Sequence, residues 1–426
     1  MKNARQIAAE ALLRVEHGGY SQLVLDAALQ KSGLSAQERQ FAAALFYGTL
    51  ERRVTLDHCI AHYARHPLSE TVAVILREAF YQLLYLDSVP AHAAVDEAVG
   101  LTRAMRQGAA AGMVNGILRS FLRDDCRIPP VKGGAAARLA VSGSCCEDLA
   151  DCLITWYGAD TAEKILAASF GRAPVFLRVN TLRTDPDTLI SRLGEEGCRA
   201  AKTSLADCLT VTGDAAHTRA HAEGLFHIQD MCSQTAALAL GAQPGESVLD
   251  LCSAPGSKSF TIAETMANRG HILSCDISAG RLRQVEKNAG RLGIDIIGTL
   301  PNDAARQNDA LGTFDRVLCD VPCSGLGVLR RKPEIKLRGR DTFARLPQTQ
   351  SAIIANAAAH VRAGGTLLYS TCTINPAENE DIVDAFLAAH TDFSPYPFDG
   401  DSRYTTHLPD ENSGDGFFIS RMRRNA

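Results

Sequence analysis

The first 125 residues carry apolar side chains at the three- and four-residue spacing of a helix. The clearest sets are Ala8, Leu12 and Val15, then Phe41, Leu45 and Leu50, then Val72, Ile75, Phe80, Leu83 and Leu84. This spacing places apolar side chains along one face of each helix, where they can pack against neighbouring helices. Glycines and prolines fall between the sets. The pattern therefore predicts an all-α bundle over residues 1–125.

The pattern changes twice before the middle of the chain. Residues 126–146 contain the pairs Pro129-Pro130 and Gly133-Gly134, which are typical of a linker. Residues 147–234 begin with helical spacing through Trp156 and Ile165. They continue with strand-like runs at 175–179, 208–211 and 225–228. We expect a small α+β subdomain over 147–234.

In residues 235–426, short apolar runs alternate with amphipathic helical stretches. The runs lie at 248–252, 272–275, 294–297, 316–319 and 366–369, and the clearest helical stretches at 279–292 and 349–361. This alternation is typical of βαβ units, which form a parallel sheet covered on both faces. We therefore predict a Rossmann-like α/β domain over 235–426. The run at 416–420 could add an edge strand.

Composition excludes several classes of protein. With 46% hydrophobic and 22% charged residues in 426, the chain has the balance of a globular protein of several domains. The 13 cysteines are scattered and include no Cys-x-x-Cys pair, so we expect reduced thiols and no metal site. Neither a signal peptide nor a membrane-spanning run is visible, and we expect a cytoplasmic protein with no membrane partner.

The ends of the predicted strands carry the unusual polar residues. In an open α/β sheet, ligands bind beyond the carboxyl ends of the strands. The turn after the first strand lacks the glycine pattern of dinucleotide binders and of phosphate loops. Asp276 is placed to accept both hydroxyls of a ribose, and Asp303 could accept from an adenine amino group. An adenosine-bearing cofactor fits this set, although each Asp alone is more often a turn residue or helix cap.

Two cysteines differ from the other eleven, which we interpret as small buried apolar residues. Cys323 follows the fourth predicted strand and Cys372 the fifth. If these strands are neighbours, the two thiols lie side by side in polar, turn-forming surroundings. Lys258 or the basic run 330–340, with six cations in eleven positions, could lower a thiol pKa. The two thiols next to Asp320 predict a nucleophilic site.

Several motifs resemble those of the RNA cytosine-5 methyltransferases. They are DLCSAPGSK at 250–258, DVPCSG at 320–325, YSTCT at 369–373, PAENE at 376–380, RVNTLR at 178–183, GLFHIQD at 224–230 and DGFF at 415–418. Asp57 and the segments GTL at 48–50, VPAHAAV at 89–95 and VNGILR at 114–119 resemble the NusB-like RNA-binding domain. The combination resembles the bacterial Sun/Fmu (RsmB) enzymes that modify small-subunit 16S ribosomal RNA. Ser257 stands where the family usually has glycine, so its φ must not be strongly positive.

This resemblance implies a class I methyltransferase domain and assigns roles to the site residues. Cys372 would attack carbon 6 of the cytosine, and Cys323 would act in the release step. Asp320, helped by Lys258, would hold the base. The implied donor is S-adenosyl-L-methionine, with contacts from Cys252, Ser253, Ala254, Pro255, Gly256, Ser257, Lys258, Asp276, Arg281, Asp303 and Asp320.

The expected partner is RNA, although the net charge of −4 does not by itself indicate a nucleic-acid binder. The basic run 330–340 would contact flanking phosphates, and we expect a monomer. Three alternatives remain open: a non-catalytic ribosome-assembly factor, a transfer-RNA methyltransferase, and a methyltransferase acting on protein or a small molecule. The intact pair of Cys323 and Cys372 argues against the first.

Overall fold

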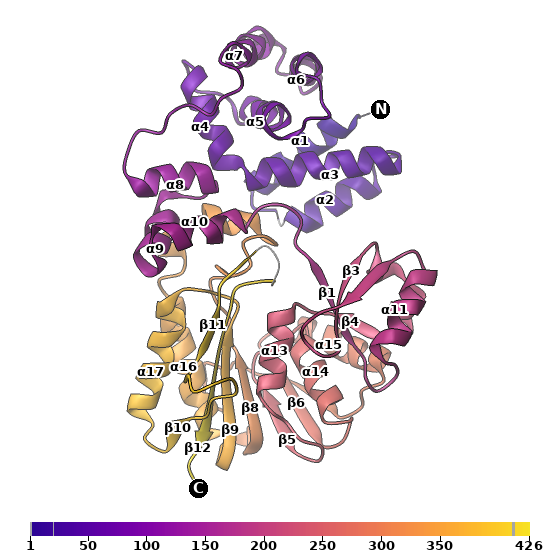
Figure 1. Cartoon of the computed structure of the whole chain (residues 1–426), viewed down its shortest axis with the longest axis vertical. Helices are drawn as coiled ribbons and strands as arrows, with labels where there is room; N and C mark the ends of the chain where they lie inside the picture. Colours follow the sequence, from indigo (N-terminus) through magenta and orange to yellow (C-terminus); the bar gives the residue numbers. More distant parts are fainter. Residues whose placement is uncertain (1, 20, 411–413) are drawn as a thin grey trace. The chain divides into compact units, whose positions relative to one another are not determined.

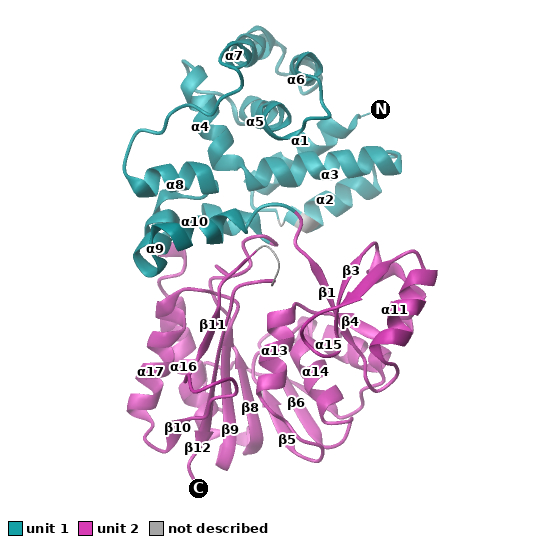
Figure 2. Cartoon of the chain, in the orientation of Figure 1, with its two compact units in different colours: residues 1–171, 332–340 teal, residues 172–331, 341–426 magenta. Residues whose placement is uncertain are grey.

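The computed structural model describes residues 2–19, 21–410 and 414–426. The chain divides into two compact units, which Figure 2 shows in different colours. The first unit is Met1–Gly171 with Lys332–Arg340. The second is Arg172–Arg331 with Asp341–Ala426.

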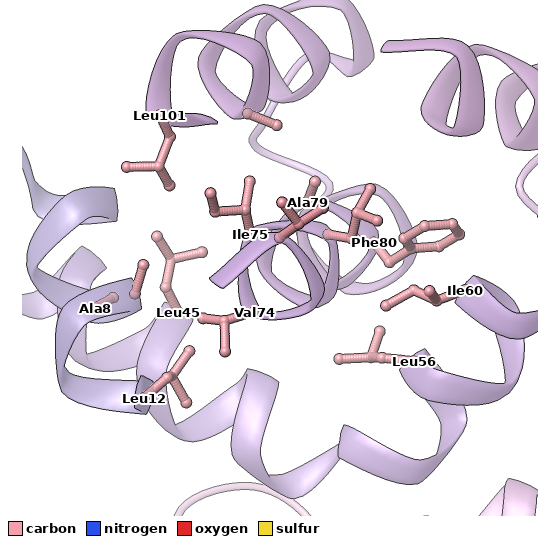
Figure 3. Close-up of a cluster of buried hydrophobic side chains, with 14 of the residues drawn as sticks. Ala8, Leu12, Leu45, Leu56, Ile60, Val74, Ile75, Ala79, Phe80 and Leu101 are labelled. Carbon is pink, nitrogen blue, oxygen red and sulfur yellow. The ribbon is translucent and has the colours of Figure 1, made fainter. Parts of the chain in front are cut away.

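The amino-terminal part of the first unit is the predicted helical bundle (Figure 1). Its helices are α1 (Ala4–Glu16), α2 (Ser21–Gln30), α3 (Ala36–Glu51), α4 (Arg53–Tyr63), α5 (Glu70–Tyr85), α6 (Ala91–Ala104) and α7 (Ala111–Arg123). Ser35 and Glu38 form a capping box at the start of α3, which satisfies backbone N–H groups there. The apolar faces meet in one core that includes Leu45, Ile75 and Phe80 (Figure 3).

The segment 126–146, expected to be a linker, contains the helix α8 (Ala135–Gly143). Leu139, Ala140 and Val141 are buried, so the small apolar residues after Gly134 form an ordered helix. The first unit continues through α9 (Glu147–Tyr157) and α10 (Ala159–Ala167), at the start of the segment 147–234 that we predict as an α+β subdomain. Helical spacing identifies such helices but not the core that they join.

The second unit begins with a small antiparallel sheet in the order β2-β3-β1-β4. Its elements are β1 (Val175–Val179), α11 (Pro186–Glu195), β2 (Arg199–Lys202), β3 (Cys208–Thr212), α12 (Arg219–Ala222) and β4 (Phe226–Ile228). The predicted runs appear as β1, β3 and β4. The edge strand β2 was not predicted, because its residues are mostly exposed and give no apolar alternation.

The large sheet has the order β10-β12-β9-β8-β5-β6-β7, with β11 paired to β12. Its strands are β5 (Ser247–Asp250), β6 (His271–Asp276), β7 (Ile297–Pro301), β8 (Phe314–Asp320), β9 (Val361–Thr371), β10 (Phe393–Pro395), β11 (Thr405–His407) and β12 (Phe417–Arg424). The helices are α13 (Met231–Ala239), α14 (Ser257–Thr265), α15 (Ala279–Leu292), α16 (Leu346–Ala359) and α17 (Glu380–Ala389). The pairs among β5 to β9 are parallel, which confirms the Rossmann-like class.

Two predicted strands differ from the structure. The run 294–297 precedes β7, because the chain leaves α15 through Gly293 and buries Ile294 before it pairs with β6. The carboxyl-terminal run is not an edge strand. It forms β12, which pairs with both β9 and β10, so β10 occupies the edge. Within the described ranges, we find no helix that is long and apolar enough to span a membrane.

Candidate active site

The loop from β5 to α14 supplies the first wall of the site. Gly256 has a φ of +105°, and a Cβ at this position would lie 2.5 Å from the ring of Phe260. Only glycine fits there without strain. Ser257 begins α14 in helical conformation, as the sequence required. The Oγ of Ser253 is buried and has no hydrogen-bond partner among the described residues.

Asp276 ends β6 and is 4% exposed. Its Oδ2 accepts from Nη1 of Arg281 at 2.9 Å, and its Oδ1 accepts from the Ser278 amide at 2.9 Å. Arg281 also donates to the carbonyl of Ala254, so it links the first loop to the end of the second strand. The structure thus brings together three of the predicted cofactor residues.

Asp303 lies after β7 and is partly exposed. Its Oδ1 accepts from the Ala305 amide at 3.1 Å, and its Oδ2 lies 3.2 Å from Nε of Arg306. These are contacts of a turn residue, and they leave the carboxylate accessible.

A pair of opposite charges joins α14 to β8. Nζ of Lys258 lies 2.7 Å from Oδ2 of Asp320, while Oγ of Ser370 donates to Oδ1 of Asp320 at 2.9 Å. Nζ of Lys258 also lies 5.1 Å from the centre of the Phe417 ring. The lysine side chain is 10% exposed, so the ammonium group is fixed by its neighbours.

Asp250, at the end of β5, was missing from the predicted site. It is buried, and burial raises its pKa to about 7. Its Oδ2 accepts from Oγ of Ser259 at 2.6 Å, and its Oδ1 has no partner among the described residues. The presence of an acid at the end of an apolar run was the signal that could have identified it.

The two predicted cysteines lie next to each other. Strands β8 and β9 are parallel neighbours, as expected, and the register pairs Asp320 with Ser370. Consequently the Sγ atoms of Cys323 and Cys372 are 3.3 Å apart. The hydrogen bond with Cys372, together with burial, raises the pKa of the Cys323 thiol well above its ordinary value.

A cavity of about 310 Å³ opens onto one of these thiols. Cys372, Lys258, Asp320 and Phe417 are among the residues that line it. This volume suits a small planar ligand such as a nucleobase.

Comparisons with known proteins place this site in a family. The model described as "16S rRNA methyltransferase RsmB/F" matches residues 237–423. The NusB family matches residues 2–123, and the RsmF/B-like ferredoxin-like domain matches residues 149–217. The "Probable ribosomal RNA small subunit methyltransferase B" of Bacillus subtilis is 36% identical, and the alignment covers 99% of each chain. The chain belongs to the RsmB/F family of ribosomal RNA methyltransferases.

Other relatives agree with this assignment. Ribosomal RNA small subunit methyltransferase B of Pasteurella multocida is 32% identical over 99% of this chain and 96% of its own. The crystal structure of the protein PH0851 matches with a TM-score of 0.82 and 25% identity, over 100% of this chain and 99% of its own. NSun6 from Pyrococcus horikoshii, solved with SFG, has a TM-score of 0.61 at 21% identity, over 66% and 98% of the two chains, and shows the fold alone. As an RsmB/F member, this chain is an S-adenosylmethionine-dependent RNA methyltransferase.

The methyltransferase fixes its two cysteine loops through a buried polar cluster that the sequence did not reveal. Oγ of Ser324 lies 2.7 Å from Oγ1 of Thr373, so the residues after Cys323 and Cys372 are joined directly. Glu378 accepts from the Ser324 amide, and Asn379 contacts Thr371 and Thr373. The only sequence indication of this cluster was the PAENE segment itself. A buried acid needs hydrogen-bond partners, and the fold decides which residues these are.

Two of the six cations in the basic run 330–340 have internal partners rather than being free for the predicted phosphate contacts. Arg331 donates from Nε to Asp415 at 2.6 Å and from Nη2 to Asp230 at 2.9 Å. Lys336 is fully buried in the first unit, where its Nζ donates to the Gly143 carbonyl and to Ser169. These cations already have internal partners, so counting charges overestimated the surface available to RNA.

Proposed function

We propose that this enzyme transfers a methyl group to carbon 5 of a cytidine in 16S ribosomal RNA, with Cys372 as the nucleophile. The observation that carries the proposal is the cavity lined by Cys372, Lys258 and Asp320, together with the distance of 3.3 Å between Sγ of Cys372 and Sγ of Cys323. The names of the family model and of the curated relatives support ribosomal RNA as the substrate class.

A thiol nucleophile would activate carbon 5 of cytosine for methylation. Carbon 5 is a poor nucleophile, whereas attack of a thiolate on carbon 6 converts the ring to an enamine with electron density at carbon 5. Asp320 would accept a hydrogen bond from the cytosine amino group. Because Lys258 lies against Asp320, its ammonium group would stabilise the negative charge that develops on the ring.

Release of the product needs a base. After methylation, the carbon 5 proton must leave so that the bond between Cys372 and carbon 6 can break. Cys323 is the nearest candidate, and it would take this proton as a thiolate. Its hydrogen bond to Cys372 is the largest cause of its raised pKa. That cause disappears once Cys372 is bonded to the ring, so Cys323 becomes easier to ionise at the stage when a base is needed.

The residues around the first loop fit S-adenosylmethionine, which supplies an electrophilic methyl group. The Gly256 turn leaves no room for a Cβ, and the buried Oγ of Ser253 lacks a partner that a ligand could provide. Asp276 and Asp303 would hold the ribose and the adenine, and Arg281 would keep the loop against Asp276. The loop residues Cys252, Ala254, Pro255 and Ser257, together with Lys258 and Asp320, would complete the site.

The target base must leave its stack to enter this cavity. For the flanking RNA we propose contacts on α6, on α7 and on the segment between them in the first unit. Residues 98–123 contain four arginines and no acid. These arginines are exposed and have no carboxylate partner within the described part of the chain: Arg103, Arg106, Arg119 and Arg123. Other arginines of the bundle, such as Arg77, are taken up by ion pairs. Unpaired surface cations suit phosphate contacts.

Nucleoside analysis tests the proposed function. The purified enzyme is incubated with methyl-labelled S-adenosylmethionine and unmethylated 16S ribosomal RNA or transfer RNA, and the digested RNA is separated by chromatography. We expect 5-methylcytidine from ribosomal RNA. Label in N4-methylcytidine, in another base or in transfer RNA alone would contradict the proposal. The Cys372→Ser variant provides the matched blank.

A further inference from the structure

A buried carboxylate lies behind the Cys323 loop. Glu378 is 0% exposed. Its Oε2 accepts from the Ser324 amide at 2.9 Å and from Nε2 of Gln350 at 2.9 Å, while its Oε1 accepts from Nδ2 of Asn375 at 2.9 Å. All three donors are N–H groups, and both carboxylate oxygens act as acceptors. The contacts therefore describe Glu378 as a buried negative charge.

The two thiols therefore have different charged neighbours. Cys372 lines the cavity, whose charged residues are Lys258, Arg331, Asp230, Asp320 and Asp415. Cys323 directly precedes Ser324, whose amide donates to Glu378. A nearby negative charge favours the protonated form of a thiol, and a nearby positive charge favours the thiolate. Glu378 is accordingly one of the groups that raise the pKa of Cys323, after the Cys372 bond and burial.

The other ionisable groups around the pair do not cancel this difference. In the cavity, Asp320 is paired with Lys258, and Asp230 and Asp415 are paired with Arg331. Burial raises the pKa of Asp250 to about 7. Burial also raises the pKa of Tyr369 well above its ordinary value, so this phenol stays neutral. Glu378 differs from these cavity carboxylates, because its side-chain partners among the described residues are neutral N–H groups and include no cation.

We propose that Glu378 is a positioning residue that holds the proton on Cys323 and thereby leaves Cys372 as the thiolate of the pair. The inference rests on the proposed function, which requires Cys372 to attack. The two Sγ atoms lie 3.3 Å apart, so the S–H of Cys323 would donate to a Cys372 thiolate and stabilise it. Gln350 fixes the arrangement, because its Nε2 also donates to the Pro322 carbonyl at 2.9 Å.

Site-resolved alkylation tests this assignment without RNA or cofactor. The whole enzyme is treated briefly with iodoacetamide over a range of pH, and the modification of each cysteine is measured by mass spectrometry. The readout is the pH of half-maximal rate, which depends on ionisation rather than on access of the reagent. In the wild type, we expect this midpoint to be lower for Cys372 than for Cys323.

Two variants of the PAENE segment make the test specific. Glu378→Gln removes the charge while keeping the shape, and we expect it to lower the Cys323 midpoint by about one pH unit, a tenfold change in thiolate fraction. Glu380→Gln is the matched control, because Glu380 accepts from Thr406 on β11 rather than from a cysteine loop. This control should leave both midpoints unchanged. Glu378→Asp keeps the charge and should keep the order of the two midpoints.

Two results would overturn the inference. One is a wild-type Cys323 midpoint equal to or below that of Cys372, which needs no variant and therefore holds even if Glu378→Gln fails to fold. The other is a folded Glu378→Gln enzyme with the wild-type midpoints. The nucleoside analysis is independent of both. A correct 5-methylcytidine product with unchanged midpoints rejects only the role of Glu378, whereas shifted midpoints without that product reject only the proposed function.

Discussion

The core of the helical bundle and the catalytic edge of the large sheet use burial in opposite ways. In the bundle, residues such as Leu45, Ile75 and Phe80 bury apolar area and need no specific partner (Figure 3). At the catalytic edge, Glu378, Asp250 and Lys258 are buried although they are ionisable. Each of them is held by particular hydrogen bonds.

This difference indicates that the bundle core mainly stabilises the fold and that the catalytic edge mainly serves activity. Burying an apolar side chain stabilises the fold in proportion to area, whereas burying a charge costs free energy unless partners compensate it. We therefore expect the buried ionisable residues of the catalytic edge to contribute to activity and to add little to the stability of the fold. Substitutions in the two regions should affect different measurements.

The largest expected effect is on stability, in the bundle. Phe80 is fully buried, and its ring centre lies 4.6 Å from that of Phe121. Phe80→Ala should lower the free energy of unfolding by about 3–5 kcal/mol, because it leaves a cavity. Urea unfolding measures the change. Leu23→Ala, at a side chain that is 67% exposed, is the control and should change little. An equal loss in both variants would show that burial does not distinguish these positions.

A second prediction concerns the catalytic edge. Asp320→Asn keeps the size of the side chain and removes the charge that Lys258 contacts. We expect kcat for methylation to fall about 10²–10³-fold, as for the loss of one preorganised electrostatic contact. The urea midpoint should change little. Asp384→Asn, which alters an exposed pair with Arg403, is the control for kcat. Retention of kcat in Asp320→Asn would remove Asp320 from the mechanism.

A third prediction uses the amine of Lys336, which is one of the buried polar groups of the first unit. Burial lowers its pKa to about 7, below the value of about 10.4 for an unfolded lysine. Between these two pH values, the unfolded chain binds the extra proton, so stability rises with pH. From pH 7 to pH 9, the wild type should gain roughly 1–3 kcal/mol relative to Lys336→Met.

Denaturant unfolding at several pH values measures this difference. Lys164→Met, at an exposed position on α10, should show the same pH dependence as the wild type. A parallel pH dependence of Lys336→Met and the wild type would mean that the Lys336 amine stays charged in the fold.

The smallest expected effect concerns RNA binding by α7. Arg119→Ala and Arg123→Ala should each weaken RNA binding several-fold and each reduce the slope of log affinity against log salt by about 1. Filter binding at several salt concentrations measures both quantities. Arg77→Ala would remove a cation that is already paired with Glu16 and Asp57, so its salt slope should match the wild type. Wild-type slopes in both α7 variants would exclude phosphate contacts there.

How far the sequence predicted the structure depended on the kind of information needed. Helices such as α15 were predicted to the residue, because periodicity reflects one-sided burial. The adjacency of Cys323 and Cys372 followed from strand order. The interior place of β12 and the burial of Lys336 were missed, since each depends on contacts between segments distant in sequence. Glu378 was quoted within a motif, but its hydrogen bonds could not be inferred from spacing.

The most direct test of the central claim compares the two alanine variants of the cysteine pair. Each variant is incubated with S-adenosylmethionine and 16S ribosomal RNA, then separated on a denaturing gel. Cys323→Ala should accumulate a protein–RNA adduct that resists denaturation, because Cys372 can attack but the product cannot be released. Cys372→Ala should form no adduct and no methylated RNA. An adduct in Cys372→Ala, or identical behaviour of the two variants, would contradict the assignment of Cys372 as the nucleophile.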